Sequence, residues 1–528
     1  MTASRFTAAV GRHVRERGDA IFCHFLTDAG PVAIPWKELG ARIGGFAAAY
    51  RARDLAPGSV VAILLRHDPA LHPSYLAAMM SGLVPTFLPC PSPRQDPAIY
   101  WDAVRAALAR LDCGAFVVAR DTLDEMRAAG LDLDERRVIL PDAVPAAGGL
   151  PSCDVDDAAI ALLQHSSGTT GGPKAVTISH RALAAQLDAY GKAVAVTRDD
   201  RVVSWLPLYH DMGLVACFLL PAFFGVPFVQ LDPFRWVARP AAFLDAIADH
   251  RGTLAWLPNF AFAHLADTAR AAPRDLSSMR AFIDCAEPCR PETLARFAGR
   301  FAAWGVRPEM LQACYAMAET VFAVTQTLPG AMPHASGGLL DLGPPVDGIA
   351  VSFRDRNGRP VPEGGFGEIA LRGDFLCDGY VRDPARTADR FRGGWFHTRD
   401  RGRRVGGALQ VAGRLDDMLV VNGRKCHAHD IEAAIDALGL TKPGRCAAFT
   451  EADERIGGNA LIVVAERRAP GDDDDVAAPI AERVCALFDM QPRDVRLVPA
   501  GWIVKTTSGK ISRAGNARKY RARELAHV

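Results

Sequence analysis

The chain has 528 residues, with 61 Lys and Arg against 60 Asp and Glu and a formal net charge of +1 at pH 7. A chain of this length has room for a large buried core, and its near-neutral charge excludes a global field that would concentrate nucleic acid or an anionic membrane, so we expect small-molecule partners and no nucleic acid. The twelve cysteines form no CxxC pair, no run of about 18 apolar residues occurs and no signal-peptide pattern is present, so a cytoplasmic protein with reduced thiols and no membrane span is expected.

In the first half of the chain, short runs of Val, Ile and Leu alternate with alanine-rich amphipathic stretches. This alternation is typical of parallel strands joined by covering helices. The elements predicted here are strands at 60–65, 159–166 and 201–207 and helices at 74–83, 179–194 and 213–225. Ser179 is the predicted N-cap of its helix, and Gly225 is a predicted C-terminal stop.

Beyond residue 340 the pattern changes to glycine-punctuated strands at hairpin spacing, which predicts an antiparallel β subdomain. After GRLDD the alternation returns, with a predicted helix at 430–438, a strand at 459–466, an acidic solvated loop at 471–476 and a helix at 480–488. The expected fold class is therefore α/β. A large N-terminal domain of wound βα sheets, with the small antiparallel β subdomain, is placed at 1–414, and a small C-terminal α+β domain at 415–528.

The segment HSSGTTGGPKA (165–175) has the composition of a phosphate-binding loop. Glycines let backbone N–H groups approach a ligand closely, hydroxyls donate hydrogen bonds and a lysine supplies positive charge. The spacing differs from a Walker A motif, because Pro173 precedes Lys174 and Ala175 follows it, which argues against a P-loop kinase or ATPase. On composition alone, the alternative is a mobile surface loop.

The same segment resembles the phosphate loop of the adenylate-forming superfamily, which includes acyl-CoA synthetases, fatty acyl-AMP ligases, nonribosomal adenylation domains and firefly luciferase. Further motifs similar to those of the superfamily follow in its order: SWLPLYHDMGLV (204–215), DCAEPCRPETLARF (284–297), YAMAET (315–320), WFHTRD (395–400), GRLDDMLVVNGRKCHAHDIE (413–432) and KTTSGKISR (505–513). The chain is identified as a member of this superfamily. Its YHDMG and AEP motifs resemble the fatty acyl-AMP ligase branch.

This resemblance implies ATP-dependent activation of a carboxylic acid to an acyl-adenylate, with pyrophosphate released and Mg²⁺ as a second cofactor. The acyl group then passes to a thiol, expected to be the phosphopantetheine of an acyl carrier protein. Residues 379–400 lack the insertion usual in the ligase branch and resemble coenzyme A ligases instead, so coenzyme A remains an alternative acceptor. A non-catalytic scaffold is disfavoured, because it would not need the lysine of the TSGK motif.

The nucleotide site is also implied by the resemblance. The loop closes over the β- and γ-phosphates, Tyr315 stacks on adenine, and Glu319 holds Mg²⁺ together with Thr169. Asp400 accepts from the ribose hydroxyls, and Arg414 reaches the ribose and phosphate. The ATP- and AMP-binding residues are Ser166, Ser167, Gly168, Thr169, Thr170, Gly171, Lys174, Ala286, Glu287, Pro288, Tyr315, Ala316, Met317, Ala318, Glu319, Asp400 and Arg414.

Two residues of the C-terminal part carry the expected catalysis. Lys510 resembles the lysine that meets the α-phosphate and the substrate carboxylate, and Gly509 is expected to permit close backbone approach beside it. Asp416 occupies the hinge position at which the small domain of the superfamily rotates between two half-reactions. The resemblance therefore implies one active site that serves both steps.

On the acyl side, the expected residues are His210, Trp256, Asn259 and Phe260. Trp256 stands where relatives often have small residues, so it either shortens the acyl pocket or is ordinary core. An amino acid substrate is disfavoured, because the 209–211 segment lacks the FDxS form of amino-acid adenylation domains.

Three positions depart from the superfamily pattern, since Cys285, Ala316 and Arg399 replace expected glycines. The loss of these glycines leaves open a degenerate member with weak adenylation.

Overall fold

The computed structural model describes residues 2–91, 97–152, 154–166, 174–270, 272–330, 332–421, 424–453, 458–469, 472–506 and 509–525. The chain forms two compact units, the first comprising residues up to Ser166, Lys174–Thr398 and Arg403–Val411, and the second Arg399–Gly402 and the residues from Ala412 onward. The functional domains placed at 1–414 and 415–528 stay a prediction. Within the described residues, no helix combines the length and the apolar character needed to cross a membrane.

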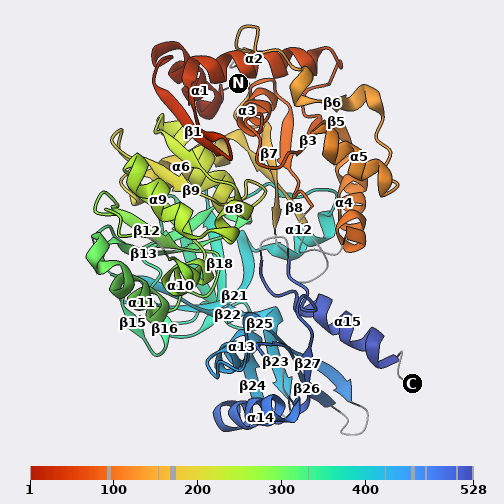
Figure 1. Ribbon diagram of the computed structural model, residues 1–528, viewed down its shortest axis with the longest axis vertical. Helices are drawn as coiled ribbons and strands as arrows, with labels where there is room; N and C mark the ends of the chain where they lie inside the picture. Colours follow the sequence, from red (N-terminus) through yellow and green to blue (C-terminus); the bar gives the residue numbers. More distant parts are fainter. Residues whose placement is uncertain are drawn as a thin grey trace. The chain divides into compact units, whose positions relative to one another are not determined.

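An eight-stranded sheet forms the centre of the first unit (Figure 1). Its strands, in spatial order, are β14 (Ala323–Gln326), β13 (Leu311–Ala316), β12 (Ala281–Asp284), β11 (Leu254–Leu257), β9 (Val202–Ser204), β10 (Phe228–Gln230), β1 (Ile21–Thr27) and β2 (Gly30–Pro35). The strands from β13 to β1 run parallel, and the edge strands β14 and β2 pair antiparallel. The strand predicted at 201–207 is confirmed, although β9 is shorter.

A second sheet of the first unit contains four parallel strands. They are β4 (Val84–Phe87), β3 (Val60–Leu64), β5 (Cys113–Val118) and β6 (Val138–Ile139). The strand predicted at 60–65 is β3, and the helix predicted at 74–83 is α3 (Leu71–Met80), of which every residue is buried. A helix buried on all sides needs apolar residues on all sides, and LHPSYLAAMM supplies most of them.

The glycine-rich segment connects two strands that pair antiparallel with each other. β7 (Ile160–Ser166) pairs with β8 (Lys174–Ser179), and β19 (Gly379–Tyr380) adds to the other edge of β8. The general expectation of parallel βα units is wrong for this element, because a short connection between neighbouring strands favours antiparallel pairing. The order of strand, glycine segment, short strand and helix is confirmed.

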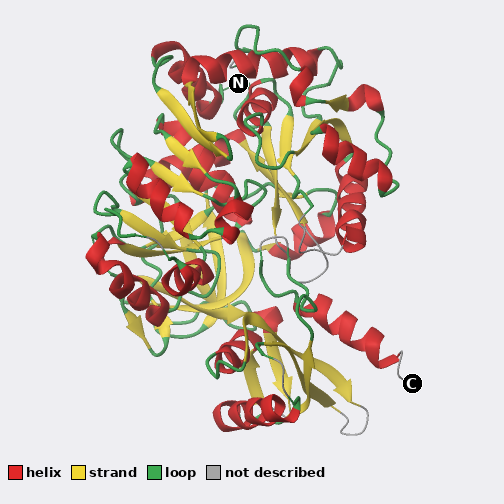
Figure 2. Ribbon diagram, in the orientation of Figure 1, coloured by secondary structure: helices red, strands yellow, loops and turns green. Residues whose placement is uncertain are grey.

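Helices flank the strands of this unit (Figure 2). They are α1 (Arg5–Glu16), α2 (Trp36–Arg51), α3, α4 (Pro97–Leu111), α5 (Arg120–Ala128), α6 (His180–Ala193), α7 (Leu220–Phe224), α8 (Pro233–Ala238), α9 (Ala241–His250), α10 (Asn259–Thr268), α11 (Pro291–Phe301) and α12 (Pro384–Arg390). The Ser179 hydroxyl accepts from the N–H of Ala182, which confirms the predicted N-cap.

The helix predicted at 213–225 has two parts. Residues Met212–Leu219 form a π-helix, η3, and α7 continues to Gly225, whose left-handed backbone ends it as predicted. Gly213 is required at the start, since an added Cβ would lie 2.3 Å from the carbonyl oxygen of Pro207. π-Helical segments often occur at functional sites, and η3 directly follows the YHD segment.

The antiparallel subdomain is confirmed. Its sheet has the strands β17 (Ile349–Arg354), β18 (Gly367–Gly373), β21 (Trp395–Val405) and β20 (Phe391–Arg392), with β22 (Ala408–Arg414) paired to β21, and the small hairpin β15 (Ala335–Ser336) and β16 (Leu339–Leu340) lies apart from it. β17 and β18 pair antiparallel over their whole length, as do β20 and β21.

The second unit is α+β, as predicted. Its elements are the hairpin β23 (Met418–Val421) and β24 (Arg424–His427), the sheet β25 (Thr441–Asp453), β26 (Gly458–Arg467) and β27 (Pro492–Val498), and the helices α13 (Ala428–Asp436), α14 (Asp474–Phe488) and α15 (Arg513–Leu525). The acidic segment is only partly a loop, because Asp474 and Asp475 form the first turn of α14. Carboxylates at a helix N-terminus interact favourably with the helix dipole, which explains the earlier start.

Candidate active site

Four neighbouring parallel strands bring the predicted motifs of the first unit to one edge of the large sheet. In spatial order these strands are β9, β11, β12 and β13. β9 leads into the YHD segment, β11 into Asn259, β12 into the AEP segment, and β13 ends at the YAMAE segment. Parallel strands present their carboxyl ends at the same edge, which is where ligands bind in open α/β sheets. Motifs that are far apart in the sequence therefore lie at the same edge of the sheet.

Side-chain contacts join the start of α10 to the AEP segment. The Asn259 amide donates to Oδ2 of Asp284 at 2.6 Å, and the N–H of Phe260 donates to a Glu287 carboxylate oxygen at 3.2 Å. The Phe260 side chain is 42% exposed, whereas Asn259 is buried. Ala286 has a φ of +73°, so the backbone turns sharply as it leaves β12. The structure thus places the expected acyl residues Asn259 and Phe260 beside the expected nucleotide wall.

Glu319 is held by a residue that sequence reasoning missed. Tyr380 donates from its hydroxyl to Oε1 of Glu319 at 2.8 Å, and the N–H of Cys377 donates to the Glu319 carbonyl at 2.8 Å. Burial raises the pKa of Tyr380 well above its usual value, so the phenol stays protonated and remains a donor. The sequence offers only the GY pair at 379–380 as a signal, at the start of the segment compared above with coenzyme A ligases.

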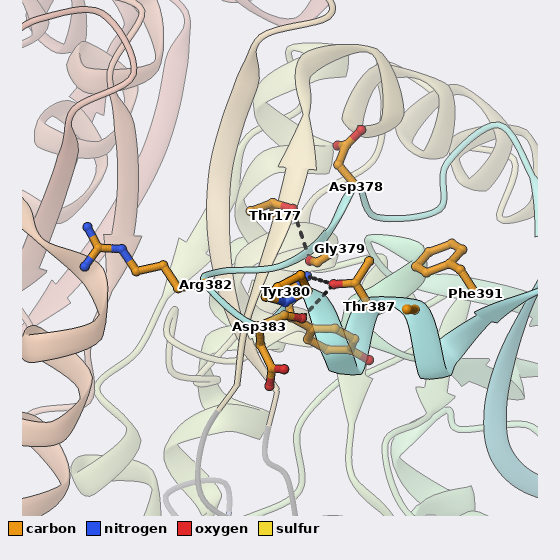
Figure 3. Close-up of a pocket in the computed structure, with 10 residues that line it drawn as sticks. Thr177, Asp378, Gly379, Tyr380, Arg382, Asp383, Thr387 and Phe391 are labelled. Carbon is orange, nitrogen blue, oxygen red and sulfur yellow. Dashed lines mark hydrogen bonds between the residues drawn. The ribbon is translucent and has the colours of Figure 1, made fainter.

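Hydrogen bonds fix Tyr380 in place (Figure 3). Its backbone N–H donates to the Thr387 hydroxyl at 3.0 Å, and the Thr177 hydroxyl donates to the Gly379 carbonyl at 3.0 Å. Thr387 lies beside Tyr380 in the close-up, while Arg382 points away. The open pocket here, of about 460 Å³, is lined by none of the predicted site residues. We therefore assign this region to support of Glu319 rather than to substrate binding.

The phosphate-loop residues Ser167, Gly168, Thr169, Thr170 and Gly171 lie outside the described residues, and so does the side chain of Ser166. The strands on either side are described. Lys174 is the first residue of β8, half-buried, and β8 carries Val176, which pairs with Tyr380. Tyr380 therefore connects the strand that follows the loop to Glu319.

The remaining acyl-side residues have defined partners. Nδ1 of His210 lies 2.6 Å from a carboxylate oxygen of Asp211 and 3.4 Å from the backbone nitrogen of Met212. Trp256 is fully buried, and its indole N–H donates to the Tyr190 hydroxyl at 2.7 Å. Tyr190 in turn donates to Gln326 at 2.9 Å. This buried polar chain fixes the indole ring in one orientation.

The three positions that lack the family glycines are accommodated differently. Cys285 is fully buried, and its interaction with Cys314 and its burial raise the pKa of its thiol well above the usual value. Ala316 is half-buried at the end of β13, where the pairing with β14 is irregular. Arg399 keeps the backbone conformation that favours glycine, with a φ of +65°. The cysteine is therefore a core residue, and the arginine is the strained substitution.

In the second unit, two predicted ribose-binding residues contact each other. Nε of Arg414 lies 3.3 Å from Oδ1 of Asp400, which is 9% exposed. The predicted hinge residue Asp416 belongs to the short 3₁₀ turn η7 (Leu415–Asp417). Its neighbour Asp417 pairs with Arg513 at 2.8 Å, and Arg513 also binds both carboxylate oxygens of Glu432. The segment after β22 is thus tied to α15 and α13.

Lys510 lies in a tight turn that begins at Lys505. Lys505 and Ile511 form an antiparallel bridge, and the Thr506 N–H donates to the Lys510 carbonyl at 2.8 Å. Gly509 has a φ of +83° with open space around the position of a Cβ. The turn conformation therefore favours glycine here, and close backbone approach to a ligand at Gly509 stays a prediction.

A stability prediction follows from Asp284, a residue whose chemistry sequence reasoning did not weigh. Asp284 is fully buried, its Oδ1 has no hydrogen-bond partner within the described part of the chain, and burial raises its pKa well above the usual value. The carboxyl must take up a proton on folding at neutral pH, whereas an amide need not. Asp284→Asn is therefore expected to stabilise the fold, by an amount that grows by about 1.4 kcal/mol per pH unit above pH 4 until the folded-state pKa is reached.

Chemical denaturation between pH 4 and pH 8 measures this difference, and Asp200 supplies the control. The Asp200 pKa is lowered, since hydrogen bonds from Arg280, Thr253 and Thr197 outweigh the effect of burial. Asp200→Asn is expected to destabilise at neutral pH, with the loss shrinking as the pH falls through the folded-state pKa. A pH-independent difference for Asp284→Asn contradicts the buried neutral carboxyl.

The fold and the arrangement of these motifs define the class of adenylate-forming enzymes. A solved structure from studies of fatty acyl-adenylate ligases of E. coli and L. pneumophila has a TM-score of 0.89 at 24% identity, covering 100% of this chain and 99% of that one. The family model of AMP-binding enzymes matches residues 10–381. The chain belongs to the AMP-binding enzyme family.

Curated relatives match over nearly the full chain. Putative ligase Rv1013 of Mycobacterium tuberculosis is 30% identical over 516 residues, which cover 92% of this chain and 94% of that protein. Long-chain-fatty-acid--AMP ligase FadD32 of Mycolicibacterium smegmatis is 28% identical over an alignment of 603 positions including gaps, which covers 97% of this chain and 93% of the relative. The identification of the superfamily from the sequence motifs is confirmed.

Proposed function

We propose that this enzyme uses ATP to convert a carboxylic acid into an acyl-adenylate with release of pyrophosphate, and then transfers the acyl group to a thiol. The convergence of the YHD, Asn259, AEP and YAMAE segments at one edge of the large sheet carries this proposal. Attack of a carboxylate on a phosphate brings two anions together, so the site must supply positive charge and fixed donors. The lysines of the two glycine-containing motifs, Lys174 and Lys510, supply such charge.

The nucleotide is proposed to bind with adenine against Tyr315 and the AEP wall, and with ribose at Asp400. Mg²⁺ is usually held by one or two carboxylates together with substrate phosphates. Glu319 fits this donor set, because Tyr380 fixes one of its carboxylate oxygens and leaves the other for a cation. Within the described residues no group of three His, Cys, Asp or Glu side chains could hold a metal unaided, so phosphate oxygens would complete the shell. Bound there, Mg²⁺ would neutralise phosphate charge.

The proposed acceptor is the phosphopantetheine thiol of an acyl carrier protein in the cytoplasm. The YHDMG and AEP motifs support it, and so do relatives named as long-chain-fatty-acid--AMP ligases. Coenzyme A stays the second candidate, because residues 379–400 are as short as in coenzyme A ligases. Mass spectrometry of products formed with a carrier protein and with coenzyme A separates the two acceptors.

The acid is proposed to be short, medium or compact. Trp256 supports this proposal, because it stands where relatives often have small residues and its hydrogen bond to Tyr190 opposes rotation of the indole. The long-chain activity named for relatives would then differ from that of this chain. A pocket walled by a fixed indole rejects extra methylenes by about 1–3 kcal/mol. The ring is fully buried, so ordinary core packing is the alternative role that a panel of acids tests.

Product analysis on a panel of acids tests the reaction. ATP should be cleaved to AMP and pyrophosphate, and octanoate or smaller acids should drive ATP–pyrophosphate exchange about 10-fold faster than hexadecanoate. Formation of ADP would overturn adenylation. Faster exchange with hexadecanoate would overturn the short pocket, and the absence of exchange with every acid would favour the degenerate member.

A further inference from the structure

Arg399 forms an ion pair with the residue proposed as the hinge. Its guanidinium donates to Oδ1 of Asp416 at 2.7 Å, and the two side chains are 40% and 23% exposed. Related sequences are expected to have glycine at this position, so the pair depends on a substitution that distinguishes this chain. Arg399 and Asp416 belong to the same compact unit.

The backbone at Arg399 shows that this side chain is kept against a conformational preference. Its φ of +65° lies in the left-handed region, which is unfavourable for a residue with a Cβ. Such positions persist where surrounding interactions hold them. The ion pair to Asp416 is an interaction that glycine could not make.

The ion pair is one of two that connect the same two segments. Arg399 on β21 binds Asp416, while the next residue, Asp400, is bound by Arg414 at 3.3 Å. The segment that contains Arg414 and Asp416 is thus attached to β21 by two ion pairs. In one pair β21 supplies the arginine, and in the other it supplies the aspartate. On the far side of the segment, Asp417 is bound to Arg513. Rotation about φ of Asp416 turns its carboxylate relative to β21 and must break or lengthen the contact with Arg399.

We propose that Arg399 is a positioning residue that restrains the hinge at Asp416 and slows passage from adenylate formation to acyl transfer. The proposal rests on the two-step function proposed above. It adds that the Arg399–Asp416 ion pair slows the hinge rotation. This effect is expected to be small, because partly exposed ion pairs are weak and screened by salt. Loss of the pair should therefore change the passage between the steps about two- to five-fold, without abolishing either step.

Arg399→Gly restores the expected family residue and removes both the charge and the strain. We expect single-turnover acyl transfer from preformed adenylate to accelerate about two- to five-fold, with ATP–pyrophosphate exchange unchanged. The wild-type enzyme should approach the variant's transfer rate at high salt, whereas the variant should respond little. Arg399→Lys, which keeps the charge, should retain most of the restraint.

The matched control is Arg382→Gly. Arg382 also has a positive φ, of +52°, and also pairs with an exposed aspartate, Asp112, at 2.9 Å, but it belongs to the first unit and makes no hydrogen bond or ion pair with the segment of Asp416 in the described part of the chain. It should leave both steps unchanged. A coupled variant adds a second check, since Asp416→Asn should accelerate transfer in the wild type and add nothing to Arg399→Gly.

Two results would overturn the proposal: a transfer rate in Arg399→Gly equal to that of Arg382→Gly, or acceleration that is fully additive with Asp416→Asn. Absence of pyrophosphate exchange in the wild-type enzyme is a different outcome, because it overturns the proposed function itself. If the wild-type enzyme catalyses pyrophosphate exchange but Arg399→Gly has no effect on transfer, the proposed function is retained and only the restraint by Arg399 is rejected.

Discussion

Replacing Lys510 with alanine is expected to lower acyl-adenylate formation by a factor of about 10²–10³ or more while ATP still binds. A charge placed where negative charge develops contributes to the transition state more than to the ground state, and loss of one such group has an effect of this size. The turn that holds Lys510 is closed by backbone contacts at Lys505, Thr506 and Ile511, so its fold does not need the ammonium group. Rapid-quench measurement of pyrophosphate release, with ATP affinity determined separately, measures the two effects.

Lys442→Ala is the control, because Lys442 lies on β25 of the same unit and has no proposed role. It should retain exchange within about two-fold, since surface substitutions away from special features have small effects. Pyrophosphate release unchanged in Lys510→Ala would reject the assignment of this lysine. Loss of ATP binding together with chemistry would instead place Lys510 in ground-state binding.

Local chemistry in the sequence predicted much of the fold. The strand at β3, the N-cap at Ser179 and the stop at Gly225 each follow from residues within a few positions of one another. The antiparallel subdomain followed from regularly spaced glycines. The argument against a Walker A motif was also local, since Pro173 precedes Lys174.

Contacts between distant segments could not be predicted in this way. Tyr380 binds Glu319 across 61 positions, and the charge pattern of the chain contains nothing that pairs Arg399 with Asp416 rather than with another acid. Asp284 differs from a surface aspartate only through its burial, which the sheet determines. Four strands had to be placed side by side before the predicted acyl and nucleotide residues lay at one edge of the sheet, and strand order is not a local property.

Asp416→Pro is expected to stop acyl transfer while adenylate formation continues. Proline fixes φ near −65°, a value compatible with the 3₁₀ turn that Asp416 occupies, and so opposes the backbone rotation proposed for the second step. If transfer requires that rotation, its rate should fall by about 10²-fold or more, because proline in an incompatible conformation is destabilised by about 3 kcal/mol. Pyrophosphate exchange and single-turnover thioester formation measure the two steps.

Asp416→Asn separates the torsional effect from the electrostatic one. It removes the charge that binds Arg399 but leaves both backbone torsions free, so transfer should continue at least as fast as in the wild type. Retained exchange in Asp416→Pro shows that the variant is folded, which matters because proline also disfavours a helical conformation at Leu415. Equal loss of both steps in a folded Asp416→Pro protein would contradict the hinge, since a residue needed only for rotation affects only the step that follows the rotation.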